Sequence, residues 1–325
     1  MIKEKLYNIM PYGVIQHMKE KKRIIPSFEE PKIYNADGRR MKVFYLQDDI
    51  CYFNPYSMAP GRFPKYILWD RNNFGLKNHF YTHRNILKTR GKPEHRYALM
   101  LESVSIMPKD YELFSKKNDI GKDYDFVFTH SQKLLNELEN ARWIPGGHVW
   151  YGGKNFGGVV SKDLYLRKTK NISMVSSDKV LCDLHKLRIN TVKKLENLRL
   201  VDGYGTYPGN RSGDTVISKT LQEYRYSIVF ENNIEDYYFT EKILNCFEAM
   251  TVPIYLGAKK IKDFFNIDGI IQLDLTDIDR LEDIIRNLGQ QDYGERRDAI
   301  LENFERVQKY LCLEDYIYNS YLCDK

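Results

Sequence analysis

Residues 230–257 read FENNIEDYYFTEKILNCFEAMTVPIYLG, and this stretch decides the fold. It predicts a strand over 226–230, a loop rich in hydrogen-bonding side chains, an amphipathic helix over 241–250 and a second strand over 252–256. A polar loop that opens a helix just past the carboxyl end of a strand is where open α/β sheets bind nucleotides. The stretch therefore predicts a nucleotide site in an α/β protein.

Strand-like and helix-like segments alternate along the rest of the chain, which is typical of α/β layers built on a mainly parallel sheet. In the first half we predict strands over 42–46, 66–69, 97–101 and 125–128, and a helix over 132–142. In the second half we predict strands over 172–175, 198–201 and 270–273, and helices over 184–195, 277–288 and 295–310. A glycine-rich break over 146–158 separates the two series.

Composition indicates a soluble globular protein, with 42% hydrophobic and 29% charged residues. The net charge of +6 comes from 50 basic residues interspersed with 44 acidic ones, which argues against a nucleic-acid partner and for at most peripheral membrane contact. Five scattered cysteines favour a reducing compartment, and we found neither a signal peptide nor a run of 18 apolar residues. We therefore expect a cytoplasmic protein unless a native anchor was removed.

The predicted helix that starts at Glu241 offers unpaired backbone N–H groups and a partial positive charge, which suit an anion. Lys242 lies in its first turn, where the ammonium could reach a pyrophosphate. Tyr238 and Thr240 add hydroxyl donors, while Asn232 and Glu241 supply an amide and a carboxylate for sugar hydroxyls. Taken alone, the Glu241–Lys242 pair also fits ordinary surface charges on a helix.

The same residues resemble the donor-site signature of the α1,3-fucosyltransferase family, glycosyltransferase family 10. The matching positions are Phe230, Glu231, Asn232, Tyr238, Thr240, Glu241, Lys242, Val252, Pro253 and Gly257, with Asn233 where the family has serine. Upstream, Arg188 and the following Val-Asp-x-x-Gly segment at 201–205 look like the family's phosphate-binding arginine, strand and loop. The convincing similarity covers about residues 170–275.

This resemblance implies an inverting, metal-independent transfer of fucose from GDP-fucose to a hydroxyl of a glycan acceptor, with no cofactor. Arg188 and Lys242 would stabilise the departing GDP. Glu102 is the candidate general base, because it ends an apolar run over 97–101 and forms, with Ser103, a pair similar to the family's base region. The alternative for Glu102 is a carboxylate that caps a loop.

The resemblance also implies a GT-B-like α/β fold, in which two Rossmann-type domains face a central cleft. A chain of 325 residues is long enough for two domains. We predict an acceptor-side domain over 1–165, a donor-binding domain over 166–300, and a C-terminal helical segment over 301–325 that returns to the first domain.

Two other functions stay open: a transferase of the same fold with another nucleotide sugar, and a non-catalytic nucleotide- or glycan-binding relative. We expect no metal site, because Asp48 and Asp49 suit a loop and Asp279 suits the first turn of a helix. Aromatic residues could form an acceptor platform in the first half, namely Tyr52, Phe53, Tyr56, Phe80 and Tyr81. The sequence does not fix the acceptor or the oligomeric state.

Overall fold

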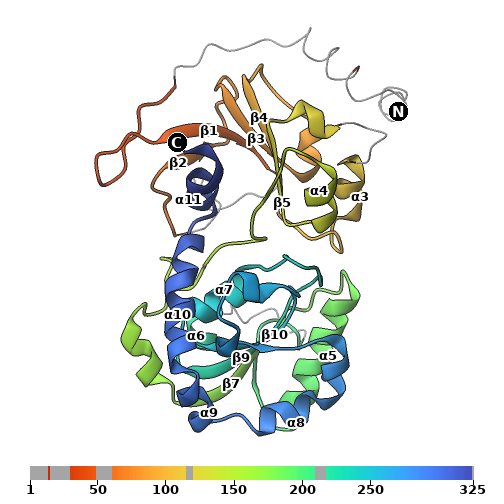
Figure 1. Ribbon diagram of the computed structural model, residues 1–325, viewed down its shortest axis with the longest axis vertical. Helices are drawn as coiled ribbons and strands as arrows, with labels where there is room; N and C mark the ends of the chain where they lie inside the picture. The colour runs from red at the N-terminus through yellow and green to blue at the C-terminus, as the bar shows by residue number, and fades with distance from the viewer. Residues whose placement is uncertain (1–13, 15–29, 49–60, 115–119, 209–216, 324–325) are drawn as a thin grey trace. The chain divides into compact units, whose positions relative to one another are not determined.

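The computed structural model describes residue 14 and residues 30–48, 61–114, 120–208 and 217–323. The chain divides into two compact units (Figure 1). The first unit contains the described residues of Met1–Met58, Phe63–Ile144 and Ile317–Lys325, and the second contains those of Ala59–Arg62 and Pro145–Tyr316. The division after Ile144 comes earlier than the predicted domain boundary at 165, so the glycine-rich segment belongs to the second unit.

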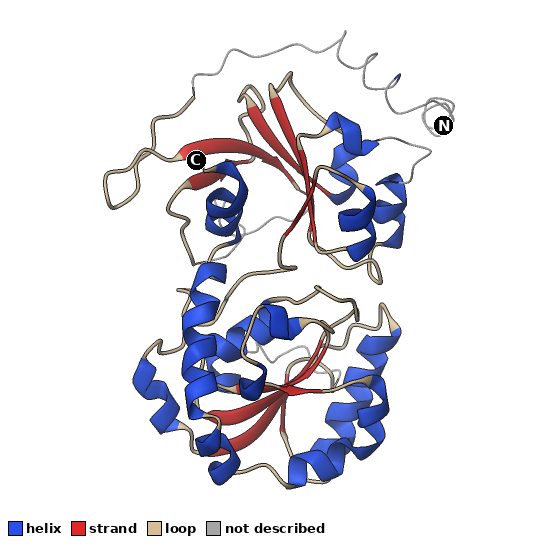
Figure 2. Ribbon diagram, in the orientation of Figure 1, coloured by secondary structure: helices blue, strands red, loops and turns tan. Residues whose placement is uncertain are grey.

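The first unit is built on a parallel six-stranded sheet. In spatial order its strands are β2 (Ile67–Asp70), β1 (Lys42–Gln47), β3 (Asn78–Thr82), β4 (His95–Met100), β5 (Phe126–Thr129) and β6 (Ala141–Trp143). Four of these strands, β1, β2, β4 and β5, coincide with predicted strands to within two residues at each end. Figure 2 shows helices beside both faces of this sheet.

The predicted acceptor platform is wrong at two of its residues, which lie in strand β3. Phe80 and Tyr81 are fully buried in this interior strand, where Phe80 packs edge-on against Phe44 and Trp69. They are core residues because an interior strand of a parallel sheet is covered on both faces. The other proposed platform residues, Tyr52, Phe53 and Tyr56, lie outside the described residues.

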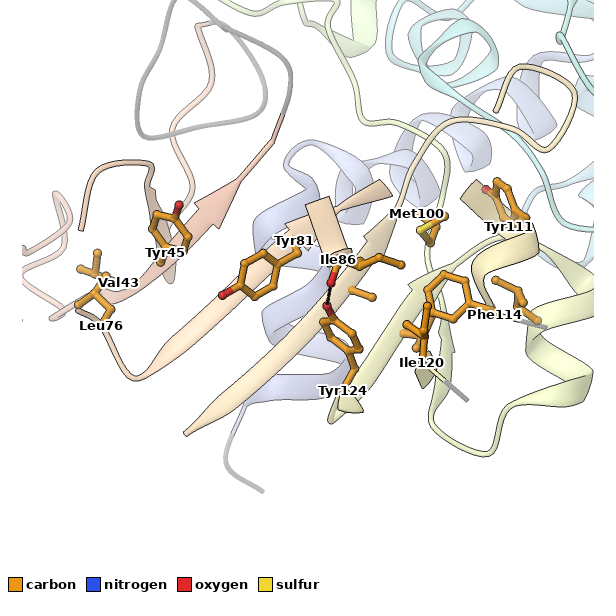
Figure 3. Packing of buried hydrophobic residues seen from close by; sticks show 13 residues of the cluster. Val43, Tyr45, Leu76, Tyr81, Ile86, Met100, Tyr111, Phe114, Ile120 and Tyr124 are labelled. Atoms are coloured by element: carbon orange, nitrogen blue, oxygen red, sulfur yellow. Dashed lines mark hydrogen bonds between the residues drawn. The ribbon is translucent and has the colours of Figure 1, made fainter. Parts of the chain in front are cut away.

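Figure 3 shows the core on one side of this sheet, where side chains of β1, β3 and β4 meet those of the segments that follow β4. Tyr124 fills the space next to Ile86, and its buried hydroxyl donates to the Ile86 carbonyl oxygen at 2.8 Å. This bond satisfies a polar group that would otherwise be costly in an apolar core. The core therefore fixes the loop after β3 to the segment that leads into β5.

Strand β6 takes the place of the second half of a predicted helix. Helix α4 (Gln132–Glu137) stops early, and Leu138 is already extended. The side-chain amide of Asn140 donates to the carbonyl oxygens of Gly121 and Tyr124, which fixes a turn before β6. This tertiary contact overrides the helical pattern of the local sequence.

The second unit is built on a parallel five-stranded sheet. In spatial order its strands are β11 (Ile271–Gln272), β10 (Val252–Leu256), β9 (Tyr224–Phe230), β7 (Lys170–Val175) and β8 (Asp202–Tyr204). The strand predicted over 198–201 is displaced to β8, because Arg199 adopts a left-handed conformation (φ 55°) that ends the preceding helix. The remaining strands confirm the prediction.

In both sheets the first strand in sequence lies between the second and the third. The later strands follow one another outward from the third strand. This order is that of doubly wound α/β folds, whose ligands bind at the carboxyl ends of the strands where the winding direction reverses. The two Rossmann-type sheets predicted for a GT-B-like chain are therefore confirmed. In the second unit the reversal falls between β7 and β9.

Helices lie between these strands and after the last of them, and most agree in position with the predicted ones. They are α3 (Pro108–Tyr111), α4, α5 (Asp183–Asn197), α6 (Ile217–Leu221), α7 (Glu241–Glu248), α8 (Leu281–Arg286), α9 (Gln290–Glu295), α10 (Arg297–Val307) and α11 (Leu313–Ile317). The helix predicted over 277–288 begins as a tighter 3₁₀ turn, because Asp274 and Asp277 form a capping box before α8. None of the described helices combines the length and apolarity that a bilayer span requires.

The first unit also includes a segment from the far end of the chain. The π-helical turn Tyr318–Leu322 places the Tyr318 ring parallel to Tyr66, with the centroids 4.8 Å apart. Tyr321 packs on Phe128, and its hydroxyl donates to the carbonyl oxygen of Trp143 at 2.6 Å. These contacts attach residues after 316 to strands formed by residues before 144.

Candidate nucleotide-sugar site

Arg188 lies at the reversal point of the second sheet. It projects from α5, and its guanidinium lies 3.5 Å from the carbonyl oxygen of Phe230, the last residue of β9, and 3.4 Å from Oγ of Ser177, just after β7. Both bonds are long, and Nε has no hydrogen-bond partner among the described residues. Arg188 is 7% exposed, so a buried cation keeps unused hydrogen-bonding capacity where doubly wound sheets bind ligands.

Burial lowers the pKa of the Arg188 guanidinium, against the attraction of the Glu231 and Glu241 carboxylates. An arginine keeps its charge under such conditions, because its ordinary pKa lies far above neutrality. The guanidinium therefore stays a cation and can accept a bidentate anion such as a phosphate.

The N-terminus of α7 is occupied by a carboxylate of the protein itself. Glu231 is fully buried, and its oxygens accept from the backbone N–H of Thr240 at 2.9 Å and from the Thr240 hydroxyl at 2.8 Å. The same hydroxyl oxygen accepts from the backbone N–H of Lys242 at 3.3 Å and so caps the helix. Thr240 therefore orders the start of α7 and holds Glu231.

Lys242 joins this cluster. Its ammonium lies 3.2 Å from Oε2 of Glu231, 2.9 Å from the Thr240 hydroxyl and 3.3 Å from Oε1 of Glu241. Burial acts to lower the pKa of Lys242, but Glu231 and Glu241 outweigh it and the pKa is raised. Burial likewise acts to raise the pKa of Glu241, yet the Lys242 ammonium lowers it. These shifts favour the charged forms of Lys242 and Glu241, whereas burial raises the pKa of Glu231 against the attraction of Lys242.

Asn232 and Tyr238 form a second pair in the same loop. The Tyr238 hydroxyl, which is buried, donates to Oδ1 of Asn232 at 2.8 Å, and the Asn232 carbonyl oxygen accepts from the thiol of Cys182 at 3.4 Å. Because Tyr238 holds the amide oxygen, the amide nitrogen of Asn232 is directed elsewhere. Tyr238 thus positions Asn232, and this loop is tied to the start of α5.

The glycine pair 146–147 packs directly on this loop. The backbone N–H of Gly146 donates to the Phe239 carbonyl oxygen at 2.8 Å. A Cβ atom on Gly147 would lie 2.9 Å from both the backbone nitrogen and Oε2 of Glu241. Only glycine fits such an approach. These residues suggested a domain boundary from sequence, but they cover the start of α7.

The structure thus brings together six predicted donor-binding residues in the second unit, namely Arg188, Asn232, Tyr238, Thr240, Glu241 and Lys242. Glu102, the predicted base, belongs to the first unit, where one residue, Leu101, separates it from the end of β4, and it is half-buried. Sequence reasoning missed Glu231 as a site residue, although it lies within the motif. In the described ranges, no group of three or more His, Cys, Asp or Glu side chains is placed to hold a metal ion.

A parallel sheet with a buried arginine at its reversal point and a cluster of charged side chains at the next helix is the arrangement of a Rossmann-type domain, a class of domain that commonly binds nucleotides. Residues 165–297 match the family model described as Glycosyltransferase family 10 (fucosyltransferase) C-term. The resemblance to glycosyltransferase family 10 that was inferred from sequence is therefore confirmed over this segment.

Curated relatives and a solved structure are also similar to the chain. A fucosyltransferase-like protein of Arabidopsis thaliana is 31% identical over 84 residues, which cover 26% of this chain and 16% of the relative. GDP-fucose protein O-fucosyltransferase 3 of Bos taurus is 26% identical over 216 residues, which cover 62% of this chain and 43% of the relative. The chain thus spans less than half the length of these relatives. A crystal structure of an α1,3-fucosyltransferase has a TM-score of 0.49 at 13% identity, covering 91% of this chain and 93% of that one.

Proposed function

We propose that the chain is an inverting, metal-independent fucosyltransferase that uses GDP-fucose. The observation that carries this proposal is the buried, incompletely bonded guanidinium of Arg188 between the ends of β7 and β9. The non-bridging oxygens of a diphosphate would supply the acceptors that this cation lacks. The match of residues 165–297 to a fucosyltransferase family, and the donor named for the Bos taurus relative, support GDP-fucose.

In this proposal the second unit stabilises the leaving group. As the bond between fucose and the diphosphate breaks, negative charge develops on the β-phosphate oxygens. Arg188 donates to those oxygens, and Lys242 adds a positive charge that Glu231 and Thr240 hold in place before the donor binds. Because these groups are already oriented, they need little reorganisation during the reaction. The roles of Asn232 and Glu241 in binding ribose or sugar hydroxyls stay predictions.

Glu102 is the proposed general base. In a single displacement with inversion, the acceptor hydroxyl attacks the anomeric carbon while its proton passes to a carboxylate, and GDP departs from the opposite face. The acceptor hydroxyl belongs either to a glycan, as the family resemblance implies, or to a protein side chain, as the name of the Bos taurus relative states for that protein. The two classes are separable by assay.

Calorimetric titration of GDP and of UDP, each in EDTA, tests the donor site. We expect GDP to bind, UDP to bind more weakly, and the chelator to have no effect. Arg188→Met should weaken GDP binding at least tenfold, which is about 1.4 kcal/mol. Lys186→Met is the matched control, because Lys186 lies on the same helix with a side chain that is 60% exposed. Equal losses in both variants would sink the assignment of Arg188.

Transfer from GDP-fucose to a panel of glycans and of Ser/Thr-containing peptides tests the activity. We expect Glu102→Gln to lower kcat at least about 100-fold and to leave a measurable residual rate, while GDP binding is retained. A preference for UDP would favour a transferase with another nucleotide sugar. Tight GDP binding without transfer or donor hydrolysis would favour a non-catalytic relative.

A further inference from the structure

The backbone around Glu102 is held by three side chains. His83 Nε2 accepts from the backbone N–H of Leu101 at 3.2 Å and from that of Glu102 at 3.0 Å. The Tyr111 hydroxyl donates to the Glu102 carbonyl oxygen at 2.5 Å. His130 Nε2 lies 3.2 Å from the carbonyl oxygen of Leu101. All four backbone polar groups of residues 101 and 102 thus have side-chain partners, which fixes the direction of the Glu102 Cα–Cβ bond.

The two N–H donors determine the protonation of His83. A ring nitrogen that accepts hydrogen bonds carries no proton, so the proton of neutral His83 is on Nδ1. Nδ1 lies 3.4 Å from Oδ2 of Asp110, a buried carboxylate whose other oxygen lies 3.2 Å from Nε of Arg84. The negative charge of Asp110 favours a proton on Nδ1, and Asp110 therefore selects the tautomer that can hold residues 101 and 102.

The conformation of His83 is unusual. Its φ is 47°, in the left-handed region, which is strained for a non-glycine residue. The residue is buried, with 7% of its surface exposed. The two hydrogen bonds that Nε2 accepts offset this strain. His83 follows β3, whereas Glu102 follows β4, the adjacent strand, so the contact joins the carboxyl ends of two neighbouring strands.

We propose that His83, oriented by Asp110, is a positioning residue that sets the direction of the Glu102 carboxylate toward the acceptor hydroxyl. This inference rests on the proposed function, in which Glu102 is the base. His83 needs no contact with substrate, because it acts through the backbone N–H groups of Leu101 and Glu102. A misplacement of a base by about 1 Å lowers a rate by about 100-fold.

His83→Asn tests the proposal with a variant that folds, because asparagine tolerates the left-handed conformation but is too short to reach both N–H groups. We expect kcat to fall about 100-fold. The KM for GDP-fucose and the affinity for GDP should stay within twofold of wild type, because Arg188 and Lys242 lie in the second unit. In the Glu102→Gln background the same substitution should cause no further loss.

His83→Gly provides a second test. Glycine adopts a φ of 47° without strain and leaves a space the size of an imidazole ring. Added imidazole should restore transfer by His83→Gly and leave wild type and Glu102→Gln unchanged. Asp110→Asn removes the charge that selects the tautomer. It should therefore lower kcat, as His83→Asn does. A purely structural role would lower stability and would show neither imidazole rescue nor dependence on Glu102.

The outcomes separate this inference from the proposed function. If kcat falls in Glu102→Gln while His83→Asn keeps the wild-type kcat, the positioning role is overturned and the proposed function stands. If wild type transfers nothing, the proposed function falls. Hydrogen exchange then decides whether His83 holds the loop: the amides of Leu101 and Glu102 should exchange faster in His83→Asn, and unchanged exchange overturns the inference as well.

Discussion

The ammonium of Lys242 lies 3.2 Å from Oε2 of Glu231, a carboxylate that is fully buried at the N-terminus of α7. The lysine side chain is 28% exposed, so one partner of this ion pair reaches solvent and the other does not. A ligand that draws Lys242 away must therefore compensate Glu231 as well. If the proposed nucleotide binds beside Lys242, the pair couples its binding to the stability of the second unit.

Lys242→Met should destabilise the protein by about 3 kcal/mol, because it leaves Glu231 as a buried charge without its cation. The double variant Glu231→Gln/Lys242→Met should lose at least about 1 kcal/mol less than the sum of the two single changes. Urea denaturation of the four proteins measures both quantities. The control is Lys260→Met, whose ammonium pairs with Asp236 at 2.8 Å but is 47% exposed, so its loss should destabilise the protein much less. A loss in Lys242→Met no larger than in this control would contradict the coupling.

Gly147→Ala should destabilise the protein by about 1–3 kcal/mol, because its Cβ would press on the backbone nitrogen of Glu241, which cannot move without displacing α7. It should also weaken GDP binding. Gly289→Ala is the control, since a Cβ there meets nothing within 4 Å and its φ of −168° is ordinary extended backbone. Thermal unfolding and GDP titration of both variants distinguish a local clash from a general intolerance of substitution.

Stability should fall as the pH is lowered from about 6.5 to about 4. Burial lowers the pKa of His148 to about 4, so this histidine stays neutral in the folded protein while the unfolded chain takes up a proton. The unfolded state then binds more protons, and the loss reaches about 3 kcal/mol at the lower limit. The free energy of unfolding, measured against pH, should depend less on pH in His148→Leu. Equal slopes for wild type and His148→Leu would refute the prediction.

Tyr238→Phe should weaken GDP binding with little change in the fold. The substitution removes the hydroxyl that donates to Oδ1 of Asn232 and releases the amide from its fixed orientation. A lost hydrogen bond to a buried group costs about 1–3 kcal/mol, divided between stability and binding. Calorimetry with GDP, together with thermal unfolding, measures the two parts. Wild-type affinity in Tyr238→Phe would mean that the orientation of Asn232 does not matter to the nucleotide.

Much of the fold was predictable because buried parallel strands leave continuous apolar runs, as in β1, β9 and β10. Strand β3 escaped prediction because it begins Asn-His, and its aromatic residues fit a surface platform equally well. Strand β6 escaped because its three residues form no pattern, and a side-chain contact from Asn140 ends the preceding helix.

The loop of the candidate site was predictable from its motif, but the partners of its side chains were not. Sequence placed Lys242 at a helix start, where it suits a pyrophosphate, yet could not show that Glu231, 11 residues earlier, accepts from it. The role of His83 was not predictable either, because the two N–H groups that donate to its ring are 18 and 19 residues away in the sequence. Such contacts depend on which strands become neighbours, and that is decided by the whole sheet.

The turn Tyr318–Leu322 has a consequence for how the protein matures on the ribosome. The first unit contains β1 to β6, yet the ring that lies on Tyr66 and the hydroxyl that bonds to Trp143 come from residues that are translated much later. The second unit is complete by residue 316, so it can fold while the sheet made before it still lacks a part. The half of the chain that is synthesised first is therefore the half that is finished last, and the rings of Tyr66 and Phe128 lack these partners in the meantime.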